Sequence, residues 1–232
     1  MMIKNTVIFD MDGLMIDSET LTYRGYIEEL ARLGHTLELP FYQTVLGNPM
    51  RDIERKFKQR YGENFPFKDV ASRVHRSMND SFVEKGVPLK RGLLQLLAWL
   101  NGRQCAVGIA TSSDRYRVDR ILDLAGIAEY FDFVVCGDEV SRGKPDPEIF
   151  LACCSKSGCA PSEAVVLEDS EPGIQASFTA GIACIAVPDM KIPEPDFIGK
   201  AYRVVGNLEE ALLVLSTNED FAIPERKKVA PF

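Results

Sequence analysis

Short apolar runs alternate with amphipathic helical patterns along most of the chain, and this alternation limits the possible folds more than any other feature of the sequence. Strands that alternate with helices form parallel sheets through crossover connections. The runs are continuously apolar, as in strands that are covered on both faces. The sequence therefore predicts an α/β fold with a parallel sheet, with strands at 6–10, 105–110, 131–136, 164–167, 183–187 and 202–205 and helices at 91–101, 114–125, 146–156, 171–180 and 208–215.

A block without strand-like runs separates the first predicted strand from the others. It shows the apolar spacing of helices instead, at 18–33, 49–60 and 67–85. We therefore expect an inserted α-helical cap domain at 18–86 and an α/β catalytic core made of 1–17 and 87–232. A helical insertion of this kind can close over a site at the strand ends. Residues 217–232 carry charges and two prolines and are expected to form a tail that is frayed or lies on the surface.

The composition argues against several classes of protein. The 232 residues include 27 Lys and Arg against 34 Asp and Glu, which gives a net charge of −7. Nucleic-acid-binding proteins usually show a basic patch instead, and no stretch approaches the ~18 apolar residues of a membrane span. The N-terminal residues do not form a signal-peptide pattern. We expect a cytoplasmic monomer or homodimer without nucleic-acid or membrane partners. The six cysteines form no CxxC pair and are expected to be reduced thiols that act as small hydrophobic side chains.

Chemically active side chains follow four of the predicted strands, and each one alone has an ordinary explanation. Paired acids can form a solvated turn, hydroxyls can cap a helix, and a lysine is most often exposed. Together they would meet at one edge of the sheet, where α/β proteins bind ligands. Carboxylates suit Mg²⁺, and helix N-termini and ammonium groups suit phosphate. The residues are Asp10 and Asp12, Thr111 and Ser112, Lys144, and Glu168 and Asp169.

Four segments in this order resemble the motifs of the haloacid dehalogenase superfamily, in the subfamily that has a helical cap and includes β-phosphoglucomutase. They are FDMDGLMIDSE (9–19), IATSS (109–113), GKPDPEIF (143–150) and VLEDSEPGIQAS (166–177). The resemblance implies a Rossmann-like three-layer core. It also implies a Mg²⁺-dependent phosphatase that hydrolyses a small phosphorylated metabolite, such as a sugar phosphate, through an aspartyl-phosphate.

The resemblance also implies a role for each residue of the motifs. Asp10 would be the nucleophile, and Asp12 would be the general acid and base. Lys144 would neutralise the phosphoryl oxygens and hold Asp10. Thr111 and Ser112 would bind phosphate. The metal ligands would be Asp10, the backbone carbonyl of Asp12, Asp169 and, directly or through water, Glu168.

One departure from the family bears on the activity. The β-phosphoglucomutase branch has a cap histidine after the first motif, and the aligned residue here is Thr22. This favours a phosphatase and leaves a phosphomutase as the alternative, followed by a catalytically idle protein that binds a phosphorylated ligand and regulates a partner. Substrate choice is expected to depend on the cap, with Arg51, Arg73, His75 and Arg76 as the candidates for specificity.

Overall fold

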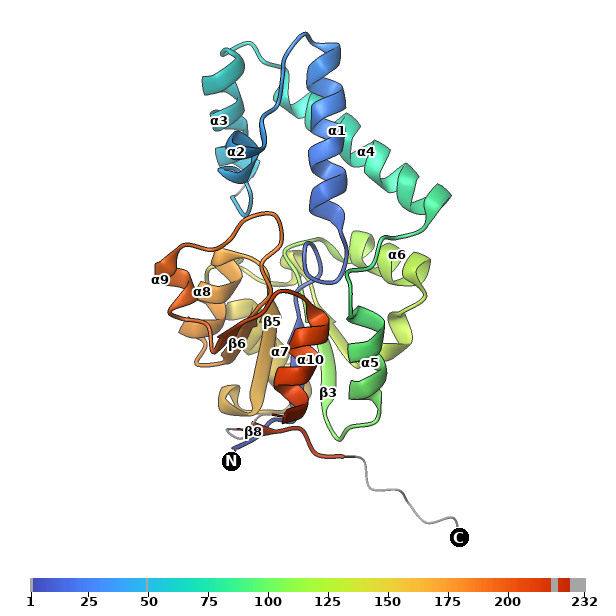
Figure 1. Cartoon of the computed structure of the whole chain (residues 1–232), viewed down its shortest axis with the longest axis vertical. Coiled ribbons are helices and arrows are strands. Elements are labelled where there is room, and N and C mark those ends of the chain that lie inside the picture. The colour runs from blue at the N-terminus through green and yellow to red at the C-terminus, as the bar shows by residue number, and fades with distance from the viewer. Residues whose placement is uncertain (1, 49, 218–220, 226–232) are drawn as a thin grey trace. The chain divides into compact units, whose positions relative to one another are not determined.

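The computed structural model describes residues 2–48, 50–217 and 221–225 of the chain (Figure 1). The chain divides into two compact units. Unit 1 consists of Met1–Ile16 and Leu89–Phe232, and unit 2 is Asp17–Pro88. No helix among the described residues combines the length and the apolar character that a membrane span requires.

Unit 1 is built on a six-stranded parallel sheet with the order β4-β3-β2-β5-β6-β7. The sheet is the predicted one, since each of its strands falls within a predicted apolar run or extends it by one residue. The strands are β2 (Thr6–Phe9), β3 (Ala106–Ala110), β4 (Phe133–Val135), β5 (Ala164–Glu168), β6 (Ala183–Ala186) and β7 (Arg203–Val204).

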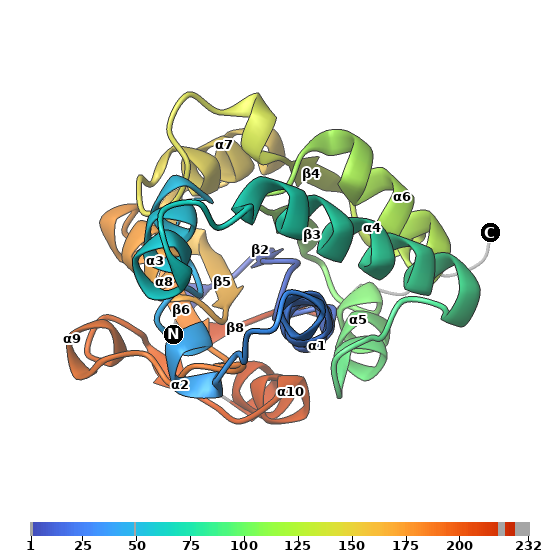
Figure 2. The same cartoon turned by 90° about the horizontal axis from the view of Figure 1, so that it is seen from above.

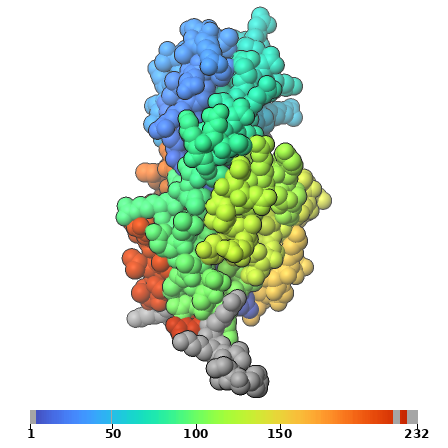
Figure 3. Space-filling view, turned by 90° about the vertical axis from the view of Figure 1, so that its right-hand side faces the viewer, coloured from blue at the N-terminus to red at the C-terminus, as the bar shows by residue number. Residues whose placement is uncertain are grey.

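Helices cover both faces of this sheet, which gives the predicted Rossmann-like three-layer arrangement. Figure 2 shows α7 (Glu148–Ser157) and α8 (Glu171–Thr179) on one face, and α5 (Leu93–Asn101), α6 (Arg115–Ala125) and α10 (Leu208–Thr217) on the other. Figure 3 shows the outer surface of unit 1 over α5 and α6. A short helix, α9 (Pro195–Ile198), lies in the loop before β7 and was not predicted.

A hydrophobic core between the sheet and helices α7 and α8 fixes the strands. Ile8 of β2 and Val166 of β5 are fully buried there, together with Ile149, Phe150 and Ile174 from the two helices. All four residues of β2 are buried, so its register, with Phe9 opposite Leu167, is strongly specified. The last residues of β2 and β5 therefore leave the sheet side by side.

Unit 2 contains the three predicted helices and one more. They are α1 (Ser18–Arg32), α3 (Met50–Tyr61) and α4 (Phe67–Lys85), and the additional helix is α2 (Leu39–Gln43). Aromatic side chains form the centre of this unit. The fully buried ring of Phe57 lies 5.1–5.3 Å from those of Tyr26, Phe41 and Phe67, measured between ring centroids. Such pairs stabilise beyond the area they bury.

The surface tail predicted at 217–232 is wrong for residues 221–225. The strand β8 (Phe221–Ala222) pairs in parallel with β1 (Met2–Ile3). Ile223 is 6% exposed, and Pro224 accepts a hydrogen bond from the backbone N–H of Gln104. One apolar residue next to a proline gives too short a pattern to predict this docking. Residues 218–220 and 226–232 lie outside the described part of the chain.

The six cysteines are free thiols, and four of them are buried. Burial raises the pKa of Cys136 to about 11 and that of Cys154 to about 12. Both thiols are therefore protonated at neutral pH and act as small apolar side chains.

Candidate active site

The carboxyl ends of β2, β3 and β5 bring the predicted residues of the core together. Asp10 directly follows β2, and its backbone N–H donates to the carbonyl of Leu167 in β5. Glu168 is the last residue of β5, Asp169 follows it, and Thr111 follows β3. Because these strands are parallel neighbours, their ends meet at one edge of the sheet.

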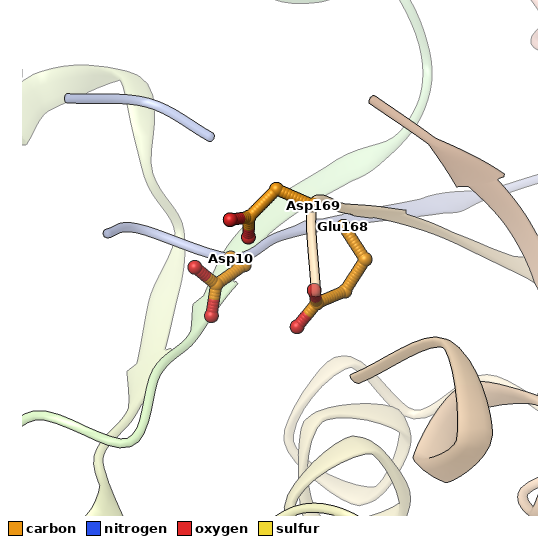
Figure 4. A group of neighbouring side chains, drawn as sticks. All are labelled: Asp10, Glu168 and Asp169. Carbon is orange, nitrogen blue, oxygen red and sulfur yellow. The ribbon is translucent and has the colours of Figure 1, made fainter. Parts of the chain in front are cut away.

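Three carboxylates form a compact cluster at this edge. Asp10, Glu168 and Asp169 each offer one oxygen, and these oxygens lie within 4.8 Å of one another (Figure 4). The turn after Asp10 makes room for the cluster because Gly13 adopts a φ of +86°. A Cβ at this position would overlap the carboxylate of Asp169, so the site requires glycine there.

Lys144 ties the three strand ends together. Its Nζ donates to Asp10 Oδ1 at 2.5 Å, to Glu168 Oε1 at 2.7 Å and to the carbonyl of Ala110 at 3.0 Å. The loop that carries it is itself held, because Glu148 at the start of α7 accepts from the backbone N–H groups of Ser141 and Arg142. The ammonium group is therefore fixed beside the acidic cluster.

Burial and charge perturb both members of the Asp10–Lys144 pair. Burial raises the pKa of Asp10 to about 7, although the neighbouring Lys144 ammonium acts in the opposite direction. Burial alone would lower the pKa of Lys144, but Asp10 and Glu168 outweigh it and hold that pKa above its ordinary value. A buried cation between acids is typical of a functional site.

Glu168 is completely buried, and both of its oxygens accept hydrogen bonds. Oε1 accepts from Lys144, and Oε2 accepts from the backbone N–H and the hydroxyl of Ser170. Gly173, in the first turn of α8, lets the carboxylate approach, because a Cβ there would overlap it. Ser170 in turn caps α8, accepting from the N–H of Gly173.

The cluster fits a hard divalent cation. Its donors are carboxylate oxygens without nitrogen or sulfur among them, a set that suits Mg²⁺ rather than zinc. Both oxygens of Glu168 accept hydrogen bonds from Lys144 and Ser170, which hold its carboxylate beside Asp10 and Asp169. The side chain of Asp12 does not belong to the cluster.

Three hydroxyl residues lead from β3 into α6. Thr111 is buried, and its Oγ1 accepts from the backbone N–H of Ser113, whereas Ser112 is exposed. The cap of α6 is Asp114, which accepts from the N–H of Arg117. The capping explanation for Ser112 and Ser113 is therefore wrong.

Asp12 makes an ion pair that the sequence analysis missed. Its Oδ2 and Oδ1 accept from the two terminal nitrogens of Arg117, at 2.7 and 2.8 Å. Ser113 Oγ also donates to Oδ2, at 2.9 Å. A signal for Arg117 was available, because a cation in the first turn of a helix opposes the helix dipole. Such a residue is expected to serve something other than the helix.

The four candidates for specificity all belong to unit 2. Arg51 and Arg76 are exposed, and His75 is half-buried. Arg73 donates through Nε to Glu29 Oε2 at 2.5 Å, and Glu29 also pairs with Arg32. Arg73 is thus engaged in an ion pair within its own unit.

Known proteins resemble the chain along most of its length. A family model described as "Haloacid dehalogenase-like hydrolase" matches residues 7–187. The "Phosphorylated carbohydrates phosphatase" of Thermotoga maritima is 30% identical over 176 residues, covering 76% of this chain and 81% of that protein. "Hexitol phosphatase B" of Escherichia coli is 33% identical over 187 residues, covering 78% of this chain and 82% of that protein.

A solved structure shares the fold over most of the chain. The crystal structure of a putative β-phosphoglucomutase from Thermotoga maritima superposes with a TM-score of 0.75 at 28% sequence identity. The match covers 90% of this chain and 97% of that one.

Proposed function

The chain belongs to the haloacid dehalogenase-like hydrolases and is a phosphoric monoester hydrolase, and from this premise we propose that it is a Mg²⁺-dependent phosphatase for small phosphorylated sugars or sugar alcohols. The observation that carries the proposal is the buried contact of Lys144 with Asp10 and Glu168 beside Asp169. Such an arrangement would supply a nucleophile, a cation and a metal site at one strand edge. The sugar class is supported by the relatives, whose names refer to carbohydrate and hexitol phosphates.

Asp10 is the proposed nucleophile. Lys144 holds its Oδ1, so the second oxygen is the one that attacks phosphorus. The P–O bond to the sugar breaks, and an aspartyl-phosphate forms on Asp10. Lys144 and the hydroxyl and N–H groups around Thr111 and Ser112 stabilise the charge on the phosphoryl oxygens.

Asp12 is the proposed proton carrier. Asp12 lies in the turn that follows Asp10, and it donates a proton to the sugar oxygen when the P–O bond breaks. It then accepts a proton from the water that attacks the aspartyl-phosphate, and Asp10 is released. Asp10, Asp169 and the backbone carbonyl of Asp12 would hold Mg²⁺, with Glu168 in support, and the ion supplies positive charge that offsets the phosphate.

Unit 2 is the proposed cap domain, and its exposed residues Arg51 and Arg76, together with the half-buried His75, are the proposed source of substrate preference. A phosphomutase has less support. Thr22, which stands where that branch has a histidine, donates its hydroxyl to the carbonyl of Ser18 and to Met78 Sδ. It therefore serves the packing of unit 2.

Phosphate release from a panel of sugar phosphates, sugar-alcohol phosphates and unrelated phosphate esters tests the proposal. We expect turnover with MgCl₂, loss of turnover after chelation, and none in Asp10→Asn. Isomerisation of a sugar phosphate with a bisphosphate activator, faster than phosphate release, would contradict the phosphatase assignment. Stoichiometric binding without turnover across the panel would support an idle regulator instead.

A further inference from the structure

Arg117 forms a two-point contact with Asp12 at the strand edge. One guanidinium nitrogen bonds Oδ2 at 2.7 Å and the other bonds Oδ1 at 2.8 Å. A fork of this kind fixes the plane of a carboxylate, whereas a single contact leaves it free to rotate. The side chains of Arg117 and Asp12 are 21% and 26% exposed, so water screens the pair only in part.

Ser113 completes the arrangement from the same helix start. Its hydroxyl donates to Asp12 Oδ2 and accepts from Arg117 at 2.7 Å. The three side chains form a closed triangle in which every edge is a hydrogen bond of 2.7 to 2.9 Å. Arg117 in the first turn of α6 and Ser113 just before that helix therefore hold the Asp12 carboxylate.

The local chain gives no reason for an arginine at this position. Arg117 is the third residue of α6, where Glu or Gln would complete a capping box and an acid would suit the helix dipole. The first turn of α6 contains Arg115 and Arg117 and no acid. Arg115 is explained by its ion pair with Glu139. A local preference that is overruled in this way is typical of a functional position.

We propose that Arg117 is a positioning residue for the general acid and base Asp12. The inference rests on the proposed function, because it assigns Arg117 to the same two proton transfers. Through its contact with Asp12, Arg117 keeps the carboxyl group in one orientation. The protonated group faces the leaving oxygen, and the carboxylate that remains after proton transfer faces the attacking water. Arg117 acts on the rate of proton transfer and not on the binding of substrate.

The test compares kcat and KM for Arg117→Ala, Arg117→Lys and a control in the same helix. Misplacement of a catalytic group can cost up to about 100-fold in rate, so Arg117→Ala should lower kcat by about 10- to 100-fold and leave KM within about twofold. Arg117→Lys keeps the charge and one contact and should recover part of kcat. Arg120→Ala removes an exposed arginine one turn further along α6 and should match the wild type.

A double-mutant cycle with Asp12→Asn separates positioning from a general effect on folding. If Arg117 acts through Asp12, then adding Arg117→Ala to Asp12→Asn should cause no further loss of kcat. The loss in Arg117→Ala should also be larger for alkyl than for aryl phosphates, since aryl leaving groups need less protonation. A folding defect would lower kcat equally in both backgrounds and for both leaving groups.

The results that would overturn the role of Arg117 differ from the result that would overturn the proposed function. If the wild type and Asp12→Asn behave as proposed but Arg117→Ala has the kcat of the wild type, only the role of Arg117 is overturned. An increase in KM with unchanged kcat would also overturn it, because Arg117 would then bind substrate. A fully additive loss in the cycle would do the same. A turnover-competent Asp10→Asn would overturn the proposed function itself.

Discussion

The ammonium of Lys144 lies 2.5 Å from Asp10 Oδ1, and both side chains are almost completely buried, with exposed fractions of 4% and 10%. The same ammonium also contacts the fully buried Glu168. Two buried acids thus share one cation. The acids depend on the cation more than the cation depends on either acid, because Lys144 keeps a partner when one acid is neutralised.

Substitution of Lys144 should therefore destabilise the protein far more than substitution of Asp10. Lys144→Met leaves Asp10 and Glu168 without their cation, and breaking a buried pair typically costs about 3–5 kcal/mol. Asp10→Asn leaves the Lys144–Glu168 pair in place and should change the free energy of unfolding much less. Denaturant unfolding in the presence of a chelator measures both.

The matched control for this comparison is Lys156→Met. Lys156 pairs with Glu139 but its side chain is 45% exposed, and exposed pairs contribute at most about 1 kcal/mol. Equal losses of stability in Lys144→Met and Lys156→Met would contradict the shared-cation interpretation.

The two aspartates after β2 should fail in different ways. Asp10→Asn should reduce turnover to background without any phosphoenzyme. Asp12→Asn keeps the nucleophile, and its turnover of alkyl phosphates should fall by about 10²–10⁴-fold. With aryl phosphates, the transfer of the phosphoryl group to Asp10 should slow less in this variant. Its aspartyl-phosphate should accumulate and be visible by intact mass spectrometry. Phosphoenzyme in Asp10→Asn would show that another residue is the nucleophile.

Stabilisation by Mg²⁺ should increase with pH. The pKa of Asp10 is about 7 in the fold and near 3.8 in an unfolded chain. Between these two pH values, Asp10 is protonated in the folded state but not in the unfolded state. The contribution of Asp10 to the free energy of unfolding therefore falls as pH rises from about 4 to about 7. A cation at the same carboxylate competes with that proton. The rise in Tm on adding MgCl₂ should be larger at about pH 8 than at about pH 5.

Asp10→Asn provides the control for this pH dependence. It removes the titrating group, so its Tm shift with MgCl₂ should be small and change little with pH. A wild-type shift that is the same at both pH values would mean that Asp10 does not bind the ion.

Gly13→Ala should damage the site as well as the fold. The φ of +86° costs an alanine about 1–2 kcal/mol, and the added Cβ would also overlap the carboxylate of Asp169. Gly181→Ala is the matched control in unit 1, since Gly181 has a φ of +73° and an added Cβ would meet no described atom within 4 Å. Both variants should lose stability, but only Gly13→Ala should need more MgCl₂ for activity. The same MgCl₂ requirement in both would contradict the assignment of Asp169 as a ligand.

The helices and strands that could be predicted from the sequence are those that depend on local or periodic patterns of residues. The six strands of the main sheet follow from apolar runs, three of which stop at the polar residues Asp10, Thr111 and Glu168. Arg117 could not be placed in the same way, because its contact with Asp12 joins residues 105 positions apart. Only the pairing of β2 with β3 brings these two turns together. The helix α2, with five residues, is too short to produce a periodic pattern.

The pairing of β1 with β8 affects the order in which the strands can pair during synthesis. Met2 lies opposite Phe221 and Ile3 opposite Ala222, and Lys4 donates its backbone N–H to the carbonyl of Ala222. During synthesis β1 leaves the ribosome first among the described strands, and β8 leaves it last. The strand β1 therefore stays unpaired until β8 has been synthesised. By then, all strands of the sheet that carries Asp10 and Asp169 are present. A chain truncated before Phe221 would contain every strand of the six-stranded sheet but would lack the strand with which β1 pairs.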